Sequence, residues 1–269
     1  NLCSSPKSSQ PRRLDLKVAW MALLRDYLRH PELPPLWNNV GCAILTMLFV
    51  KAALEAAVRI PTMPVVKRQE PRILVHLVVS SSIILWPLYD TTDWSWRLNA
   101  IVPAVLATRM VYKGIFLRDP DDLEVQIMSR SFSPLELLGG PLQLFGVLVW
   151  LGLARFMTVE ALILVAALGI GDSIAPWIGM RFGRHVYRMP FAKAKTMEGS
   201  VCGVFLGTIS GCYFYSYVMG IAFLPLRMFL AYAAIAAVVE GTSPGNVDNL
   251  TVALALHLSM DRVQSWLPS

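Results

Sequence analysis

Charged residues are scarce in this sequence. Only 16% of its 269 residues are Asp, Glu, Lys or Arg, whereas 55% are hydrophobic. A soluble domain would show amphipathic stripes, and these are missing. Apolar runs of about 18–20 residues recur instead, and each is long enough to cross roughly 30 Å of hydrocarbon. The composition therefore excludes an ordinary soluble core and predicts an all-α fold, a polytopic transmembrane helical bundle.

Cysteine is also scarce, and nucleic-acid motifs are missing. The four cysteines include no CxxC pair and no nearby His at zinc spacing, so we interpret those in apolar runs as small buried hydrophobes. The net charge of +6 comes without a basic, aromatic-interleaved strip, and we expect no nucleic-acid partner. The first residues also lack the charged-then-apolar pattern of a cleaved signal peptide.

The apolar runs predict about seven spans and a shorter C-terminal piece. The spans cover residues 38–57, 73–90, 98–115, 137–156, 158–177, 199–219 and 221–240. The run from Leu250 to Met260 is too short for a normal span, so it predicts a half-span or a short tilted span. We expect residues 1–36 to form a disordered tail and, over 16–28, a helix that is either surface-bound or simply solvated. Residues 37–269 form the predicted transmembrane domain.

Basic loops orient these spans. Loops 58–72, 116–136 and 178–198 fall on one side of the predicted bundle and carry most of the loop Lys and Arg residues. The positive-inside rule places that side in the cytoplasm. The basic N-terminal tail falls on the other side of this count, so either the first span is not a simple crossing or the segment before it hides another.

The stretch 171–200 joins an acid to a dense basic loop. Asp172 lies near the end of a predicted apolar span, where a carboxylate is costly unless it meets a cation, water or a partner. It is either a Mg²⁺ ligand that shares the ion with phosphate, or a helix-end aspartate, or a partner of Arg181. The basic residues that follow it are Arg181, Arg184, Arg188, Lys193 and Lys195.

Two patterns in this stretch have both a structural and a functional interpretation. Small residues repeat every fourth position, which favours close helix packing or the approach of a ligand: Gly171, Ala175, Gly179 and Gly183. The basic loop is either a cytoplasmic anchor or a phosphate site, because a lysine, hydroxyls and glycine amides can cradle phosphate. The residues for the second interpretation are Lys195, Thr196, Gly199 and Ser200.

Three further groups of polar residues fall on the same predicted face. Arg72 and His76 are four residues apart, hence on one side of a helix. A second group precedes a Gly-Gly-Pro entry into the membrane, although an acid there also suits the helix dipole: Ser129, Arg130 and Glu136. A third group flanks the start of the last apolar piece: Glu240, Asp248 and Asn249. Their agreement in position indicates one site at this face.

Five segments of the chain resemble the CTP-dependent lipid-alcohol kinases. They are PRILVH, MSRSFSPLELLGGPL, GDSIAPWIGMRFGRH, KAKTMEGS and the acidic DNL near residue 248, and they cover most of 72–250. The resemblance is closest to the phytol and farnesol kinases and more distant to dolichol kinase. It implies an integral-membrane enzyme that transfers the terminal phosphate of CTP to the hydroxyl of an isoprenoid alcohol, with Mg²⁺ or another divalent cation.

The resemblance also implies roles for the candidate residues. Asp172 would hold the metal, with Glu240 or Asp248 as a second ligand. The nucleotide and its phosphates would be bound by Lys195, Thr196, Gly199, Ser200, Arg72, Arg130, Arg181, Arg184 and Asn249. The proton of the alcohol would go to one of three acceptors, and the residues do not choose among them: His76, Glu136 or Asp248.

Two other functions share parts of this pattern. Phosphatidate cytidylyltransferases, which make CDP-lipids, resemble the central stretch, but they carry a His-Gly-Gly run before a C-terminal DRxD, and this chain has only MDRVQS at 260–265. The third hypothesis is a transporter or a non-enzymatic scaffold. We expect a multi-pass protein of the endoplasmic reticulum, with a plastid membrane as the alternative, because the N-terminus lacks a transit-peptide composition. The sequence does not give the oligomeric state.

Overall fold

The computed structural model describes residues 33–59, 70–129, 131–190, 192–221, 223–245 and 247–265. The predicted tail and the candidate helix at 16–28 lie outside these residues. The helices are α2 (Pro35–Arg59), α3 (Glu70–Ser80), α4 (Ile101–Val111), α5 (Leu123–Met128), α6 (Gly140–Ala154), α7 (Val159–Val165), α8 (Asp172–Phe182), α9 (Leu206–Met219), α10 (Leu226–Thr242) and α11 (Asp248–Ser265). Two short strands, β1 (Val186–Tyr187) and β2 (Lys195–Thr196), pair antiparallel.

Tighter and wider helical turns extend several of these helices. The 3₁₀ segments are Ser81–Leu88, Trp94–Ala100 and Pro134–Leu138, and the π segments are Tyr112–Leu117, Ala166–Gly171 and Gly199–Phe205. With them, six stretches of the described residues are long and apolar enough to cross a membrane: Pro35–Ala57, Pro71–Leu88, Trp94–Leu117, Pro134–Ala154, Val159–Phe182 and Gly199–Met219. The predicted all-α polytopic membrane bundle is confirmed.

The C-terminal part differs from the sequence prediction. The seventh predicted span, 221–240, corresponds to α10, which has only 17 residues because it begins after Pro225. The apolar run of the predicted half-span lies within the 18-residue helix α11, which is not among the stretches of the described residues that are long and apolar enough to cross a membrane. The apolar run ends at Met260, but the helix continues through polar residues to Ser265 and packs against α10.

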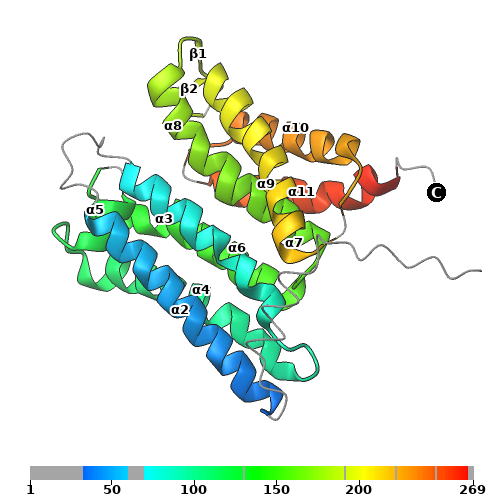
Figure 1. Cartoon of the computed structure of the whole chain (residues 1–269). Coiled ribbons are helices and arrows are strands. Elements are labelled where there is room, and N and C mark those ends of the chain that lie inside the picture. Colours follow the sequence, from blue (N-terminus) through cyan, green and yellow to red (C-terminus); the bar gives the residue numbers. More distant parts are fainter. Residues whose placement is uncertain are drawn as a thin grey trace, which may run out of the picture.

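The centre of the bundle is the run 161–168. Each of these residues, from Ala161 to Leu168, has at most 1% of its surface exposed. A helix that is apolar on all sides belongs in the middle of a bundle, because every face can then pack against a neighbour. In Figure 1, α2 to α6 lie on one side of this centre and α8 to α11 on the other, with α3 alongside α8.

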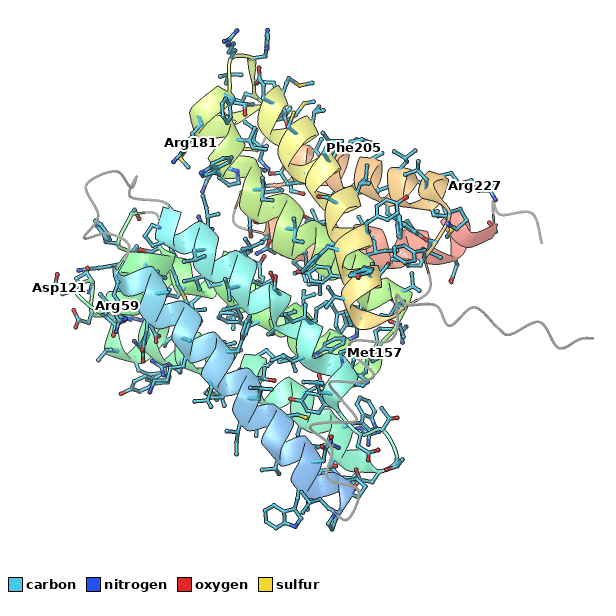
Figure 2. All side chains as sticks on the ribbon, in the orientation of Figure 1. Arg59, Asp121, Met157, Arg181, Phe205 and Arg227 are labelled. Carbon is cyan, nitrogen blue, oxygen red and sulfur yellow. The ribbon has the colours of Figure 1, made fainter. Side chains whose placement is uncertain are left out.

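The predicted basic loops lie together at one end of the bundle. Arg59 ends α2 and Asp121 lies in the turn before α5, and Figure 2 shows both at the same end, far from Met157. The start of α3 and the start of α6 also lie together, since Arg72 approaches Gly140. The grouping of these loops agrees with the sequence, and their cytoplasmic orientation stays a prediction.

Candidate active site

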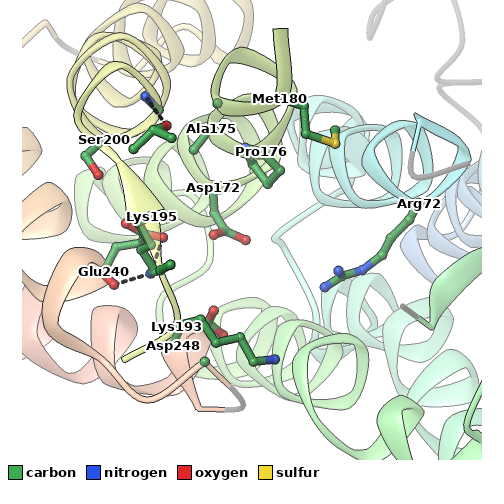
Figure 3. A pocket seen from close by; sticks show the side chains of 15 residues that line it. Arg72, Asp172, Ala175, Pro176, Met180, Lys193, Lys195, Ser200, Glu240 and Asp248 are labelled. Atoms are coloured by element: carbon green, nitrogen blue, oxygen red, sulfur yellow. Dashed lines mark hydrogen bonds and ion pairs between the residues drawn. The ribbon is translucent and has the colours of Figure 1, made fainter. Parts of the chain in front are cut away.

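A pocket opens where the ends of α3, α8, α10 and α11 meet the β hairpin (Figure 3). Its cavity volume is about 350 Å³. Eight of the residues predicted for the site line it: Arg72, Asp172, Lys195, Thr196, Gly199, Ser200, Glu240 and Asp248. They come from segments up to 176 positions apart in the sequence (72 to 248), so the fold assembles the site from most of the chain.

Asp172 lies deeper in the bundle than the sequence indicated. The helix around it continues ten residues further to Phe182, which is about 15 Å at the helical rise. A π segment, Ala166–Gly171, ends directly before it, and such segments often mark functional sites. Pro176, one turn later, has no amide hydrogen to donate to the Asp172 carbonyl. The acid therefore stands at an irregular turn inside a membrane-spanning helix.

Four charged side chains surround the Asp172 carboxylate. Asp248 and Glu240 add negative charge, whereas Arg72 and Lys195 add positive charge. Figure 3 shows Arg72 reaching toward Asp172 from the opposite wall of the pocket. The Arg181 guanidinium lies over the Trp177 ring, 4.8 Å from its centroid, and does not line the pocket. The cations that act on Asp172 are therefore Arg72 and Lys195.

The small-residue face of α8 packs directly on the helical segment Gly199–Phe205 and the start of α9. A Cβ atom added at Gly203 would lie 2.3 Å from the Cα of Ala175, and one added at Gly207 would lie 3.1 Å from the Cα of Gly171. No side chain fits at such a distance, so the two backbones touch. The packing interpretation of the repeat is thereby confirmed, and it gives the pocket a rigid wall.

The wall ends in a helix N-terminus that faces the pocket. The Gly199 amide donates to the Thr196 hydroxyl at 3.1 Å, so Thr196 caps this end. The Ser200 hydroxyl is 2.7 Å from the Tyr187 hydroxyl of the opposite strand. Helix N-termini attract anions through their amides and their dipole, so this arrangement suits the predicted phosphate cradle. The phosphate-binding role itself stays a prediction.

Lys195 is held by α10. Its ammonium donates to both the backbone carbonyl and the carboxylate of Glu240, and only 15% and 9% of the two side chains are exposed. A lysine has three hydrogens to donate, so two of them are directed at Glu240 and one remains for the pocket. Glu240 therefore positions the lysine, and its predicted role as a metal ligand stays untested.

Glu198 ties the two sides of the hairpin together. Its carboxylate accepts from the His185 amide at 3.3 Å and lies 2.7 Å from the His185 ring nitrogen Nδ1. Backbone hydrogen bonds, its own amide first, and the bond to the His185 ring lower the pKa of Glu198 to about 2. This carboxylate fixes the loop that carries Lys193 and Lys195.

Two features of the pocket have only weak signals in the sequence. The charges over 178–198 predict a plain basic loop, although the alternation Ala-Lys-Ala-Lys-Thr over 192–196 is typical of a strand. Lys193 has no role in the sequence prediction beyond being a loop cation, yet it lines the pocket, and Figure 3 shows it beside Asp248. Both lysines belong to the same pocket wall.

Arg181, Arg184 and Glu136 are three of the candidate residues that do not line the pocket. Arg181 and Arg184 are exposed side chains outside its lining. The Glu136 carboxylate accepts from the amide and the hydroxyl of Ser131, at 3.1 and 3.0 Å, and does not line it either. These interactions close the turn before α6, which is the structural role that a helix-entry acid often has. A fourth candidate, Arg130, lies outside the described residues.

His76 lies behind the pocket rather than in its lining. It is buried, one turn along α3 from Arg72, and its Nδ1 is 3.2 Å from the Ser173 hydroxyl. Ser173 follows Asp172 directly, so this hydrogen bond fixes α3 against α8 at the level of the acid. The structure therefore gives His76 a position from which it supports Asp172.

Asn249 links the two halves of the bundle. Its amide nitrogen donates at 2.9 Å to the carbonyl of Gly140, the first residue of α6. Its side-chain oxygen is buried and has no hydrogen-bond partner among the described residues. Asn249 also lines a narrow gap, too small for a water molecule, together with Asp172, Glu240 and Asp248. Carboxylate and amide oxygens are ligands that suit a hard cation.

The described residues contain no group of three His, Cys, Asp or Glu side chains arranged to hold a metal ion. A cage made only of protein ligands is therefore not supported. Mg²⁺ on a nucleotide needs only one or two carboxylates, because phosphates and water complete its shell. Asp172, with the buried Asn249 oxygen nearby, supplies that kind of donor set, so the residues present fit a Mg²⁺ ion shared with phosphate.

Comparisons with known proteins point to one family. No family model and no solved structure match the chain. It is 28% identical over 238 residues to the probable phytol kinase 2, chloroplastic, of Oryza sativa subsp. japonica, a match that covers 85% of the chain and 77% of that protein. It is 24% identical to the phytol kinase of Synechocystis sp., over 85% of the chain and 93% of the relative.

A third relative carries a different substrate in its name. The chain is 29% identical over 200 residues to the farnesol kinase, chloroplastic, of Arabidopsis thaliana, which is 70% of the chain but only 63% of that protein. Over most of its length the chain is thus similar to several proteins named phytol kinase or farnesol kinase, which supports a kinase that acts on a lipid alcohol.

Proposed function

We propose that this protein is a membrane kinase that transfers the terminal phosphate of a nucleoside triphosphate, CTP, to the hydroxyl of an isoprenoid alcohol of the phytol or farnesol type. The names of its relatives support a lipid-alcohol kinase. The observation that carries the proposal is the pocket itself. Acids, cations and a helix N-terminus meet there at the end of a bundle, and Asp172 lies about 15 Å along α8 from the C-terminal end of that helix.

The pocket can bind the phosphates of the donor through fixed positive groups. Lys195 is oriented by Glu240, and Arg72 reaches across from α3. The capped helix N-terminus at Thr196 adds amide donors. Phosphoryl transfer depends mainly on positioning and on neutralising charge, so a preorganised set of this kind supplies most of what the reaction needs.

The acids divide the remaining tasks. Asp172 and Asn249 would hold Mg²⁺, which when bound shields the negative charge of the phosphates. Of the three predicted proton acceptors, Asp248 lines the pocket, whereas Glu136 does not. His76 lies behind the pocket, where it is hydrogen-bonded to Ser173. We assign the proton of the alcohol to Asp248. The apolar tail of the alcohol stays among the spans, because it partitions into the bilayer.

The relatives also bear on localisation. Two of the three proteins compared above are named chloroplastic, and none is named for the endoplasmic reticulum. A plastid membrane therefore replaces the endoplasmic reticulum in the proposal. None of the three is named as a cytidylyltransferase, a transporter or a scaffold, so these alternatives have no support beyond the sequence patterns described first.

The proposal is tested with membranes that contain the expressed protein. Labelled CTP and ATP are offered with phytol, farnesol, dolichol or diacylglycerol, and the labelled lipid product is measured. We expect CTP-dependent formation of phytyl or farnesyl phosphate. Release of pyrophosphate with a CDP-lipid product would favour a cytidylyltransferase, and the absence of lipid-dependent turnover with either donor would overturn the proposed activity.

A further inference from the structure

A second hollow adjoins the pocket at the outer end of the hairpin. It has a volume of about 530 Å³ and shares Lys193 and Gly245 with the pocket. Its other lining residues come from the hairpin loop and from the turn between α10 and α11: Arg188, Met189, Pro190, Ala192 and Pro244. The two hollows therefore adjoin at Lys193 and Gly245, so one extended ligand could contact both.

The chemistry of these two adjoining hollows differs. The pocket, which is the deep part, is lined by carboxylates, two lysines and a helix N-terminus. The outer hollow has no acid in its lining among the described residues, and it combines one guanidinium with the apolar surfaces of Met189, Pro190 and Pro244. A nucleoside triphosphate matches this order, because its charged phosphates suit the deep part and the flat face of its base suits the apolar surfaces of the outer hollow.

The direction of binding follows from the acceptor. The terminal phosphate must meet the hydroxyl of an alcohol whose tail lies in the membrane, so it occupies the deep end. Lys193 and Lys195 are two residues apart, and two residues of extended chain span about 7 Å. They can therefore contact different phosphates of one triphosphate. This order leaves the nucleoside at the outer hollow.

We propose that the outer hollow, formed by Arg188, Met189, Pro190 and Pro244, is the binding subsite for the nucleoside of the phosphate donor. This inference rests on the proposed function. The apolar ledge packs against the face of the base, and the Arg188 guanidinium stacks on the base or donates to it. Discrimination between donors then resides in the hairpin loop at the surface rather than in the membrane-spanning helices.

The test compares a nucleotide with a ligand that lacks the nucleoside. Binding of labelled CTP to the full-length protein in detergent, with Mg²⁺, is measured at equilibrium, and inorganic tripolyphosphate is used as a competitor. Two variants change the outer hollow, Arg188→Ala and Met189→Ala. Arg227→Ala is the control, because it removes the same charge from an exposed position that lines neither hollow and has no predicted role in the site.

We expect Arg188→Ala to weaken CTP binding about tenfold, as for the loss of one charge-assisted contact. Met189→Ala should weaken it about threefold, and the inhibition constant of tripolyphosphate should change by less than about twofold in both variants. Unchanged CTP binding in both variants would overturn the inference. Equal losses for CTP and tripolyphosphate would also overturn it, because the hollow would then bind phosphate.

The outcome is separable from that of the proposed function. Binding of CTP is measured without turnover, so a protein that binds CTP but phosphorylates no alcohol would contradict the kinase activity alone. If all variants phosphorylate phytol or farnesol with the same dependence on CTP concentration, this result would contradict only the nucleoside subsite. Arg227→Ala should match the unchanged protein in both measurements.

Discussion

Replacing Lys195 with methionine tests whether its ion pair with Glu240 organises the pocket. The pair is largely buried, and the Glu240 carboxylate lies near Asp172 and Asp248. Lys195→Met removes the cation and leaves three acids together. Loss of one partner from a buried ion pair costs about 3–5 kcal/mol. We expect the lower end of that range, because 15% of the lysine side chain is exposed to solvent.

A second change separates stability from catalysis. In Glu240→Gln the lysine keeps its bond to the Glu240 carbonyl, so we expect a cost of only about 1.5 kcal/mol. The double variant no longer has a buried unpaired acid at position 240, and it should be more stable than Lys195→Met alone by about 1–2 kcal/mol. Its phosphorylation of the alcohol should still be at least about 100-fold lower, because the cation that faces the phosphates is absent.

The measurements are thermal unfolding in one detergent and turnover with CTP and alcohol. Lys193→Met is the matched control for stability, since it removes the same charge two residues away from an exposed side chain. It should leave the free energy of unfolding within about 0.5 kcal/mol of the unchanged protein. A Lys195→Met protein as stable as this control, or a double variant less stable than Lys195→Met, would refute the role assigned to the pair.

Three further predictions concern the acid, the helix contact and the hairpin. Asp172→Asn should lower turnover at least about 1,000-fold while the protein elutes as a folded particle; an active, Mg²⁺-dependent variant would contradict its role. Gly203→Val should destabilise by about 1–3 kcal/mol in thermal unfolding, because its Cβ would lie 2.3 Å from the α8 backbone, whereas Gly146→Val, with nothing within 4 Å, should not. Because the pKa of Glu198 is lowered in the folded protein, its carboxylate stabilises the hairpin fully above about pH 4.5, and this stabilisation is lost as the pH falls toward 2. Hydrogen exchange of the hairpin amides, corrected for intrinsic rates, should therefore become faster as the pH falls over that range. Glu198→Gln should remove this pH dependence, and a variant that retained it would exclude Glu198 as the cause.

The spans could be predicted because each depends on the composition of its own segment. A run of apolar residues forms a helix in a membrane almost regardless of its neighbours, since its backbone must satisfy its own hydrogen bonds. The ends were less accurate, because they depend on packing. The helix of Asp172 continues to Phe182 and packs on the neighbouring helical segment, where Gly203 meets Ala175. Likewise, α11 extends beyond its apolar run and packs against α10.

The sequence could predict which residues form the candidate site, but not how their side chains are arranged. Residue type and side of the membrane sufficed to group Arg72, Asp172, Lys195 and Asp248, and the structure places all four around one pocket. They did not show which acid faces which cation. The pairing of Lys195 with Glu240 depends on how a hairpin meets a helix 45 residues later, and no local pattern records that contact.

The bond between Asn249 and the Gly140 carbonyl has a consequence for biosynthesis. It connects α11 to the first residue of α6, 109 residues earlier, and Asp248 completes the ring of charges around Asp172. A nascent chain that has emerged only as far as α10 thus has the lysines and Asp172 but neither of these two groups. The pocket is complete only when α11 docks, so a growing chain would stay catalytically silent until α11 is inserted.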